Sequence, residues 1–123
     1  MGSVDNLDNM IRAQKRGEAR GIVSICSANP FVIEASCRHA IRAEIPVLIE
    51  STCNQVNQFG GYTGLTPQQF VDYVAAIAEK LDFPRERLLL GGDHLGPYPW
   101  RAEPVQIAMQ KSCLLYTSPS PRD

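Results

Sequence analysis

The chain has 123 residues, of which 44% are hydrophobic and 20% charged, and its formal net charge is -1. This length accommodates one domain, and this hydrophobic content is that of a globular protein rather than a disordered one. The balance of 12 basic and 13 acidic residues excludes a strongly charged surface that would gather nucleic acid or an anionic membrane. No apolar stretch reaches the roughly 18 residues of a membrane span, and the amino terminus lacks the apolar middle of a secretory signal. We therefore expect a cytoplasmic protein with reduced thiols and neither nucleic-acid nor membrane partners.

The first expected elements are a helix over about Val4–Arg16 and a strand over Gly21–Ser27. The helix is indicated by Leu7, Met10 and Ile11, which recur at helical spacing. The strand is indicated by a short β-branched stretch that glycine and polar residues bound.

A second helix is expected to begin at Asn29 and Pro30, because these types are favoured at the N-cap and at the first helical position. Pro46 ends it, since the residue before a proline is disfavoured in the α region. A second strand follows over Val47–Ile49, with Glu50 at its carboxyl end.

The polar, glycine-rich stretch Ser51–Leu65 is longer than most structureless connections, which indicates a functional loop. Thr66 and Gln69 then have the spacing of a capping box, so a third helix is expected to begin there. A third strand is expected over Arg87–Gly92, and a fourth helix is expected to start at Glu103 and Pro104.

The last eleven residues, CLLYTSPSPRD, show no helical or strand period and follow a helical segment that is unfinished. They can be back-translated into one frame of a common transposase-type sequencing adapter. We therefore expect a natural domain over residues 1–112 and an artefactual tail over residues 113–123.

The alternation of apolar strands with helices predicts an α/β fold with a parallel sheet. Both a doubly wound sheet and a (β/α) barrel begin in this way, and no nucleotide-binding glycine motif follows any strand. In a barrel the chemistry lies at the carboxyl ends of the strands. Polar side chains gather at all three predicted ends, at Ser24, Cys26, Ser27 and Asn29, then Glu50, Asn54, Gln55 and Gln58, then Asp93 and His94.

Asp93 and His94 admit two interpretations. A neutral imidazole can bind a divalent metal while the neighbouring carboxylate transfers a proton. Alternatively, Asp93 caps the following turn and His94 packs under Trp100. A catalytic zinc site usually needs three protein ligands, and this chain offers one well-placed histidine, so further ligands would come from outside it.

Three segments carry a resemblance to a known family: GIVSICSANPFVIEAS, VLIESTCNQVNQFGGYTGLTPQQF and LLLGGDHLGPYPW. They resemble the amino-terminal part of the non-catalytic subunits of D-tagatose-1,6-bisphosphate aldolase, the GatZ/KbaZ family, over nearly all of Gly21–Gln110. An older label for this family is tagatose-6-phosphate kinase, but no kinase motif occurs in this stretch.

The resemblance implies a TIM (β/α)8 barrel related to class II aldolases, in which a histidine-bound zinc ion polarises the ketose carbonyl and an aspartate moves the proton. It implies that Asp93 occupies the acid/base position and His94 a metal-ligand position. The family's loop motif makes Glu50, Asn54, Gln55 and Gln58 expected contacts of a sugar phosphate or of the metal shell. The family's supporting role toward a separate catalytic subunit makes Asp93 a candidate for a vestigial residue.

Two functions remain for the complete protein. It is either the accessory subunit of the aldolase in galactitol, N-acetylgalactosamine or tagatose catabolism, or a metal-dependent ketose or ketose-phosphate 4-epimerase or aldolase that acts alone. A barrel needs about 250 residues, and three βα units are expected here. We therefore expect this chain alone to be an inactive, incomplete barrel that does not unfold cooperatively as a monomer, because its outer strands are open edges.

Overall fold

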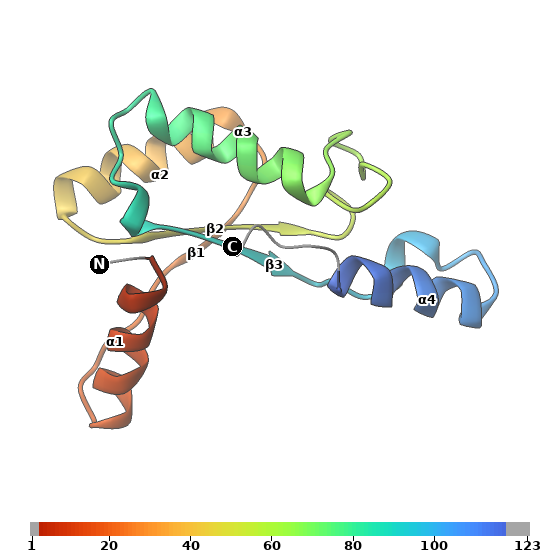
Figure 1. Ribbon diagram of the computed structural model, residues 1–123, viewed down its shortest axis with the longest axis horizontal. Coiled ribbons are helices and arrows are strands. Elements are labelled where there is room, and N and C mark those ends of the chain that lie inside the picture. Colours follow the sequence, from red (N-terminus) through yellow and green to blue (C-terminus); the bar gives the residue numbers. More distant parts are fainter. Residues whose placement is uncertain (1–2, 118–123) are drawn as a thin grey trace. The chain divides into compact units, whose positions relative to one another are not determined.

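Helices and strands alternate in the computed structural model, which describes residues 3–117 (Figure 1). Its elements are, in chain order, α1 (Ser3–Lys15), β1 (Ser24–Cys26), α2 (Pro30–Ala43), β2 (Val47–Thr52), α3 (Pro67–Glu79), the 3-10 turn η1 (Arg85–Arg87), β3 (Leu88–Asp93), the 3-10 turn η2 (Tyr98–Trp100) and α4 (Val105–Tyr116). No helix among the described residues is long and apolar enough to cross a membrane.

The chain forms two compact units. The first comprises the residues up to Glu50 together with Ala75–Gly91, and the second comprises Ser51–Val74 together with the residues from Gly92 onward. The first unit contains most of the sheet, and the second contains the polar loop that follows β2 and the helix α4.

The sheet has the strand order β1-β2-β3. β1 and β2 are parallel, with Ser24 opposite Leu48 and Cys26 opposite Glu50, and the arrows of β2 and β3 point the same way in Figure 1. Sequential order with helical crossovers makes this an α/β sheet, and three such strands are how both a (β/α) barrel and a doubly wound sheet begin. The predicted α/β class is confirmed.

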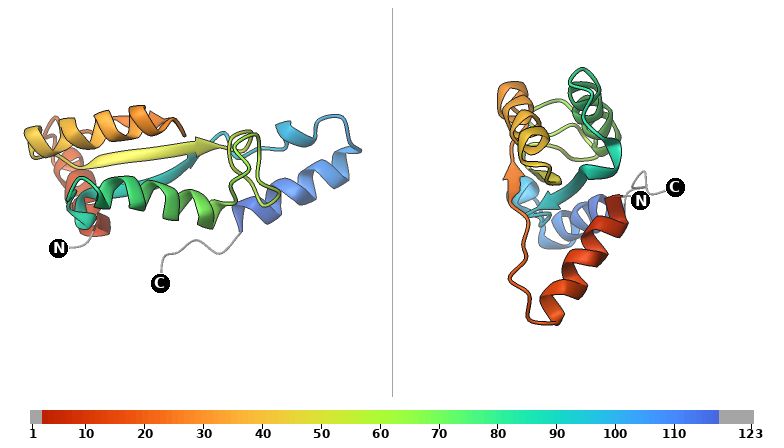
Figure 2. Two further views of the ribbon diagram at one scale, coloured as in Figure 1. Left: turned by 90° about the horizontal axis from the view of Figure 1, so that it is seen from above. Right: turned by 90° about the vertical axis from the view of Figure 1, so that its left-hand side faces the viewer.

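One face of the sheet is covered by helices. α2 and the Ala75–Glu79 end of α3 lie on the same side of it (Figures 1 and 2). In β2, Val47 and Ile49 are buried while Leu48 and Glu50 are half-buried, so alternate side chains serve different faces.

The predicted starts of α2 and α3 are confirmed, whereas α1 begins at Ser3, one residue earlier than expected, and α4 begins at Val105, after the expected start. Asn29 accepts hydrogen bonds from the backbone N–H groups of Phe31 and Val32, as an N-cap does. α2 ends at Ala43 rather than at the proline, because Glu44 takes a left-handed conformation (φ 54°) that closes the helix.

The strand boundaries were less well predicted. β1 begins at Ser24, three residues later than expected, and β2 continues to Thr52. The expectation that Glu50 ends β2 is therefore wrong, because two further residues follow it in the strand.

The fourth helix passes through the boundary expected at residue 112. α4 continues to Tyr116, and Leu115 is buried in a cluster with Cys53, Trp100 and Ala108, against which Leu95 packs. The interpretation that the last eleven residues have no helical period is therefore wrong for Cys113–Tyr116. Residues 118–123 lie outside the described residues, and the adapter origin of the tail stays a prediction.

Candidate functional site

Glu50 lies in the middle of the first unit's sheet, on the face opposite the buried side chains of β2. It sits beside Gly91 of β3: a Cβ added to that glycine would lie 3.2 Å from Glu50 Cγ and 3.4 Å from Glu50 Oε1. Glu50 is also the register partner of Cys26. The missing side chain at Gly91 thus leaves room for the carboxylate on this face of the sheet.

The loop after β2 is closed by its own backbone. The N–H of Tyr62 donates to the carbonyl of Asn54 (2.8 Å), and the N–H of Thr63 donates to the carbonyl of Gln55 (3.2 Å), which also accepts from Thr63 Oγ1 (2.6 Å). Gly61 has φ 55°, and an added Cβ would lie 2.4 Å from the Gln55 oxygen. Only a glycine in this conformation permits so close a backbone approach.

Amide side chains also hold this loop together. Asn57 is buried; its Nδ2 donates to the Cys53 carbonyl (2.8 Å), and its Oδ1 accepts from the N–H of Phe59 (2.8 Å). Gln55 Oε1 accepts from the N–H of Thr52 (2.8 Å). The predicted contact residue Gln55 thus has a structural role here, and Asn57 was missed. Asn57 could have been identified from the tendency of asparagine side chains to accept a hydrogen bond from the backbone N–H two residues ahead.

Gln58 joins the loop to α4. Its Nε2 donates to the Lys111 carbonyl (2.9 Å), while its buried Oε1 has no hydrogen-bond partner among the described residues. Lys111 pairs with Glu103 at 2.8 Å, and its ammonium lies 5.4 Å from the centre of the Phe59 ring. Asn54, in contrast, is exposed on the loop.

Asp93 ends β3 and His94 follows it, as the sequence predicted. His94 Nε2 lies 3.5 Å from Asp93 Oδ2, and the His94 side chain is 82% exposed. The alternative in which His94 packs under Trp100 is therefore wrong; Trp100 instead meets Phe59 edge to face at 6.0 Å. An exposed imidazole beside a carboxylate can bind a ligand or exchange protons with solvent.

The backbone of His94 is unusual. Three non-glycine residues in the described part of the chain have positive φ: Glu44, Asp82 and His94. Glu44 follows the last residue of α2, and Asp82 lies in the turn after α3, where its N–H donates to the carbonyl of Glu79; left-handed geometry is common at such helix ends. His94 (φ 51°) follows a strand instead, and left-handed geometry costs a non-glycine residue about 1–2 kcal/mol. Such strain often accompanies functional positions.

Potential metal ligands within the described residues do not gather around His94. Residues 3–117 contain no group of three or more His, Cys, Asp or Glu side chains placed to hold a metal ion. Asp93 and His94 supply two potential ligands. Within the described part of the chain, they do not make a complete zinc site.

The chain is similar to known proteins over most of its length. The family model described as D-tagatose-1,6-bisphosphate aldolase subunit GatZ/KbaZ-like matches residues 7–118. D-tagatose-1,6-bisphosphate aldolase subunit GatZ of Salmonella dublin is 55% identical over 106 residues, which are 86% of this chain and 25% of that protein. The GatZ subunit of Salmonella paratyphi B is 54% identical over the same span. A crystal structure of a probable tagatose 6 phosphate kinase from Sinorhizobium meliloti 1021 has 62% identity and a TM-score of 0.73, covering 76% of this chain and 24% of that one. The chain thus spans about a quarter of the length of these relatives.

Proposed function

Because the chain belongs to the GatZ/KbaZ-like family of D-tagatose-1,6-bisphosphate aldolase subunits, we propose that the full-length protein is the non-catalytic subunit of such an aldolase. It supports the activity and stability of a separate catalytic subunit in the cytoplasmic catabolism of galactitol, N-acetylgalactosamine or tagatose. The observation that carries this proposal is the 55% identity to proteins named as aldolase subunits, over 86% of the chain.

The complete protein is proposed to be a TIM barrel. The sequential strand order and the helices on one face of the sheet support this, because each βα unit of a barrel adds a parallel strand beside the previous one and a helix on the outer face. The relatives are about four times as long as the matched stretch, which leaves enough chain for the missing units.

Within this chain, the proposed contacts of the sugar are Glu50 and Asn54. Glu50 is held on the face of the sheet that the helices leave open, and Asn54 is exposed on the loop. Gln55 and Gln58 would act by holding that loop in shape. In TIM barrels phosphate groups are often bound by loops after the seventh and eighth strands, which would lie beyond this stretch of the protein.

The second candidate is an epimerase or aldolase that acts alone. The strained and exposed His94, in contact with Asp93, favours it. Zinc is the proposed cofactor, with His94 as a ligand and Asp93 as the acid/base group, and the remaining ligands would come from the rest of the protein. When bound, zinc would supply polarisation of the ketose carbonyl.

The deciding experiment compares the full-length protein alone, a catalytic aldolase subunit alone, and the two together, with cleavage of D-tagatose 1,6-bisphosphate as the readout. The accessory role predicts no turnover by the protein alone and higher activity and a higher inactivation temperature of the catalytic subunit in the mixture. Turnover by the protein alone, with no effect on the catalytic subunit, would assign the second function instead.

The metal proposal is tested with the two histidines of this chain. We expect His94→Ala to lower the zinc content of the purified full-length protein markedly, and His39→Ala, a change at an exposed position on α2, to leave it unchanged. Equal zinc content in both variants would contradict the ligand role of His94.

A further inference from the structure

The left-handed backbone of His94 needs a restraint from its surroundings, because strained conformations persist in proteins where neighbouring structure enforces them. His94 has φ 51° and follows a strand rather than a helix. Its side chain is 82% exposed, so packing of the imidazole does not supply the restraint. The restraint therefore acts on the residues next to His94 in the chain.

Leu95, the residue that follows His94, is held from two sides within the second unit. Its carbonyl accepts a hydrogen bond from Ser112 Oγ (2.9 Å). Its side chain packs against the buried cluster around Trp100. The same side chain lies close to Gly92, where an added Cβ would be 2.8 Å from Leu95 Cδ1 and 2.9 Å from Cδ2. These contacts fix both the carbonyl and the side chain of Leu95, and they restrict the backbone on the carboxyl side of His94.

The Ser112 hydroxyl makes its contact from a buried position. Ser112 lies in α4 and is 8% exposed. A serine inside a helix often bonds the carbonyl four residues earlier or faces solvent. Here the hydroxyl instead bonds a carbonyl 17 residues away in the sequence, in the segment that carries His94. Because a buried donor is costly to leave unpaired, the folded protein maintains this bond.

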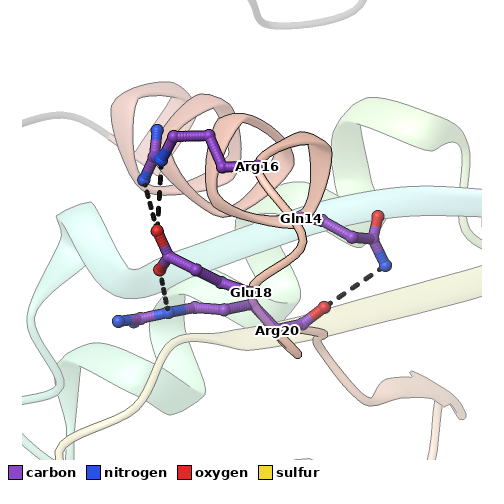
Figure 3. Close-up of polar contacts among 4 residues, drawn as sticks. All are labelled: Gln14, Arg16, Glu18 and Arg20. Atoms are coloured by element: carbon purple, nitrogen blue, oxygen red, sulfur yellow. Dashed lines mark hydrogen bonds and ion pairs between the residues drawn. The ribbon is translucent and has the colours of Figure 1, made fainter.

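A bond of the same kind occurs in the first unit, but it is exposed (Figure 3). Gln14 Nε2 in α1 donates to the carbonyl of Arg20 at 3.3 Å, and the Glu18 carboxylate lies between the guanidinium groups of Arg16 and Arg20. Every residue of this connection is described, and none except a glycine has a positive φ. Gln14 therefore provides a comparison in which a helix side chain holds a carbonyl but no strained residue.

We infer that Ser112 and Gly92 are positioning residues for His94. Ser112 holds the Leu95 carbonyl, and Gly92 leaves room for the Leu95 side chain. Together they keep His94 in the left-handed conformation in which its Nε2 lies 3.5 Å from Asp93 Oδ2. The consequence for metal binding rests on the proposed role of His94 as a zinc ligand: an imidazole that is already oriented loses less conformational freedom when it binds.

A double-mutant cycle in the full-length protein, stripped of metal with a chelator, tests the inference. The urea midpoint is measured for the unsubstituted protein, His94→Gly, Ser112→Ala and the double variant. Glycine adopts the left-handed conformation without strain, so His94→Gly should raise the midpoint. In the Ser112→Ala background the rise should be about half as large or less, because the backbone there has already relaxed. Gln14→Ala is the matched control, and in its background His94→Gly should have its full effect.

Two results would overturn the inference: no rise of the midpoint in His94→Gly, or an equal rise in the unsubstituted and Ser112→Ala backgrounds. A merely structural role of Ser112 predicts the second of these results, because its effect would simply add to that of His94→Gly. If Ser112→Ala does not fold, Gly92→Ala replaces it with the same expectation, since the added methyl group displaces the Leu95 side chain.

Zinc affinity, measured by competition with a chelating dye, shows whether this positioning serves a metal site. We expect Ser112→Ala to weaken the zinc affinity of the full-length protein about tenfold or more, as the loss of groups that orient a metal ligand does. Gln14→Ala should leave the affinity unchanged. A loss of affinity in His94→Ala but not in Ser112→Ala would overturn the positioning role toward the metal. Unchanged affinity in His94→Ala would contradict the proposed ligand role instead, and the cycle measured without metal would still decide whether Ser112 positions His94.

Discussion

Different forces hold the sheet of the first unit and the loop of the second unit. Ile49 and Ile33 in the first unit are fully buried, and their contribution comes from apolar surface removed from water. In the loop, buried Asn57 and half-buried Gln55 hold the chain by hydrogen bonds to backbone groups. The stability of the sheet should therefore fall when a buried side chain is made smaller. The stability of the loop should fall when a hydrogen-bond donor, an acceptor or a glycine is removed.

The packing of the sheet is disrupted most directly by a substitution at Ile49, the fully buried residue in the middle strand. We expect Ile49→Ala to lower the free energy of unfolding of the full-length protein by about 4 kcal/mol, because it removes buried methyl and methylene groups and leaves a cavity. Urea denaturation followed by circular dichroism measures this loss. Ile49→Val, which keeps most of the volume, should cost about 1 kcal/mol; equal losses for the two variants would contradict a packing origin.

The conformation of the loop is disrupted most directly by a substitution at Gly61. We expect Gly61→Ala to cost about 3 kcal/mol, because the added Cβ would meet the Gln55 carbonyl carbon and oxygen at 2.5 and 2.4 Å while the residue keeps φ 55°. The same urea titration applies, together with hydrogen exchange of the amides of Tyr62 and Thr63, which donate across the loop.

Gly64 provides a matched control for Gly61. It also has a positive φ (77°), but nothing lies within 4 Å of an added Cβ. Gly64→Ala should therefore show the conformational cost alone, about 1 kcal/mol, and leave loop exchange nearly unchanged. If the two variants lose the same stability, then steric contact with Gln55 is not what makes Gly61 necessary.

The same contrast explains which parts of the fold could be predicted from sequence. The N-cap at Asn29 and the capping box of Thr66 and Gln69 depend on neighbours three residues apart or closer, and both occur as predicted. The extent of β1 depends on a pairing partner distant in sequence, and here pairing with β2 covers only Ser24–Cys26. Local chemistry fixed the helix starts, whereas strand ends needed the tertiary structure.

The candidate site was predicted less completely. The order of β3, Asp93 and His94 was correct, but neither the exposure nor the left-handed backbone of His94 can be obtained from spacing. In the loop, polarity indicated ligand contacts, yet an amide that holds a backbone group and an amide that holds a sugar look identical in sequence. Gln55 therefore received a predicted role in binding, and Asn57 received none.

The smallest expected effect is a pH dependence of stability that arises from two buried thiols, Cys37 in the first unit and Cys53 in the second. Burial raises the pKa of the Cys37 thiol in α2 above its usual value, and burial also raises the pKa of Cys53, although backbone hydrogen bonds at Cys53 and Asn54 partly offset it. Unfolded thiols ionise first as the pH rises, so ionisation stabilises the unfolded chain. The contribution of both thiols is fully present below about pH 8.5 and is lost as the pH rises through the folded pKa values.

We therefore expect the urea midpoint of the full-length protein to stay constant from neutral pH to about pH 8.5. At higher pH the midpoint should fall, and the two thiols should add to the fall that other alkaline titrations cause. Cys37→Ala and Cys53→Ala should each reduce the steepness of that fall, whatever they do to stability at neutral pH. Because desolvation is unopposed at Cys37 and opposed at Cys53, the larger reduction should come from Cys37→Ala. An unchanged slope in both variants would show that the two thiols ionise alike in the folded and unfolded chains, and that burial in helix and loop does not affect their protonation.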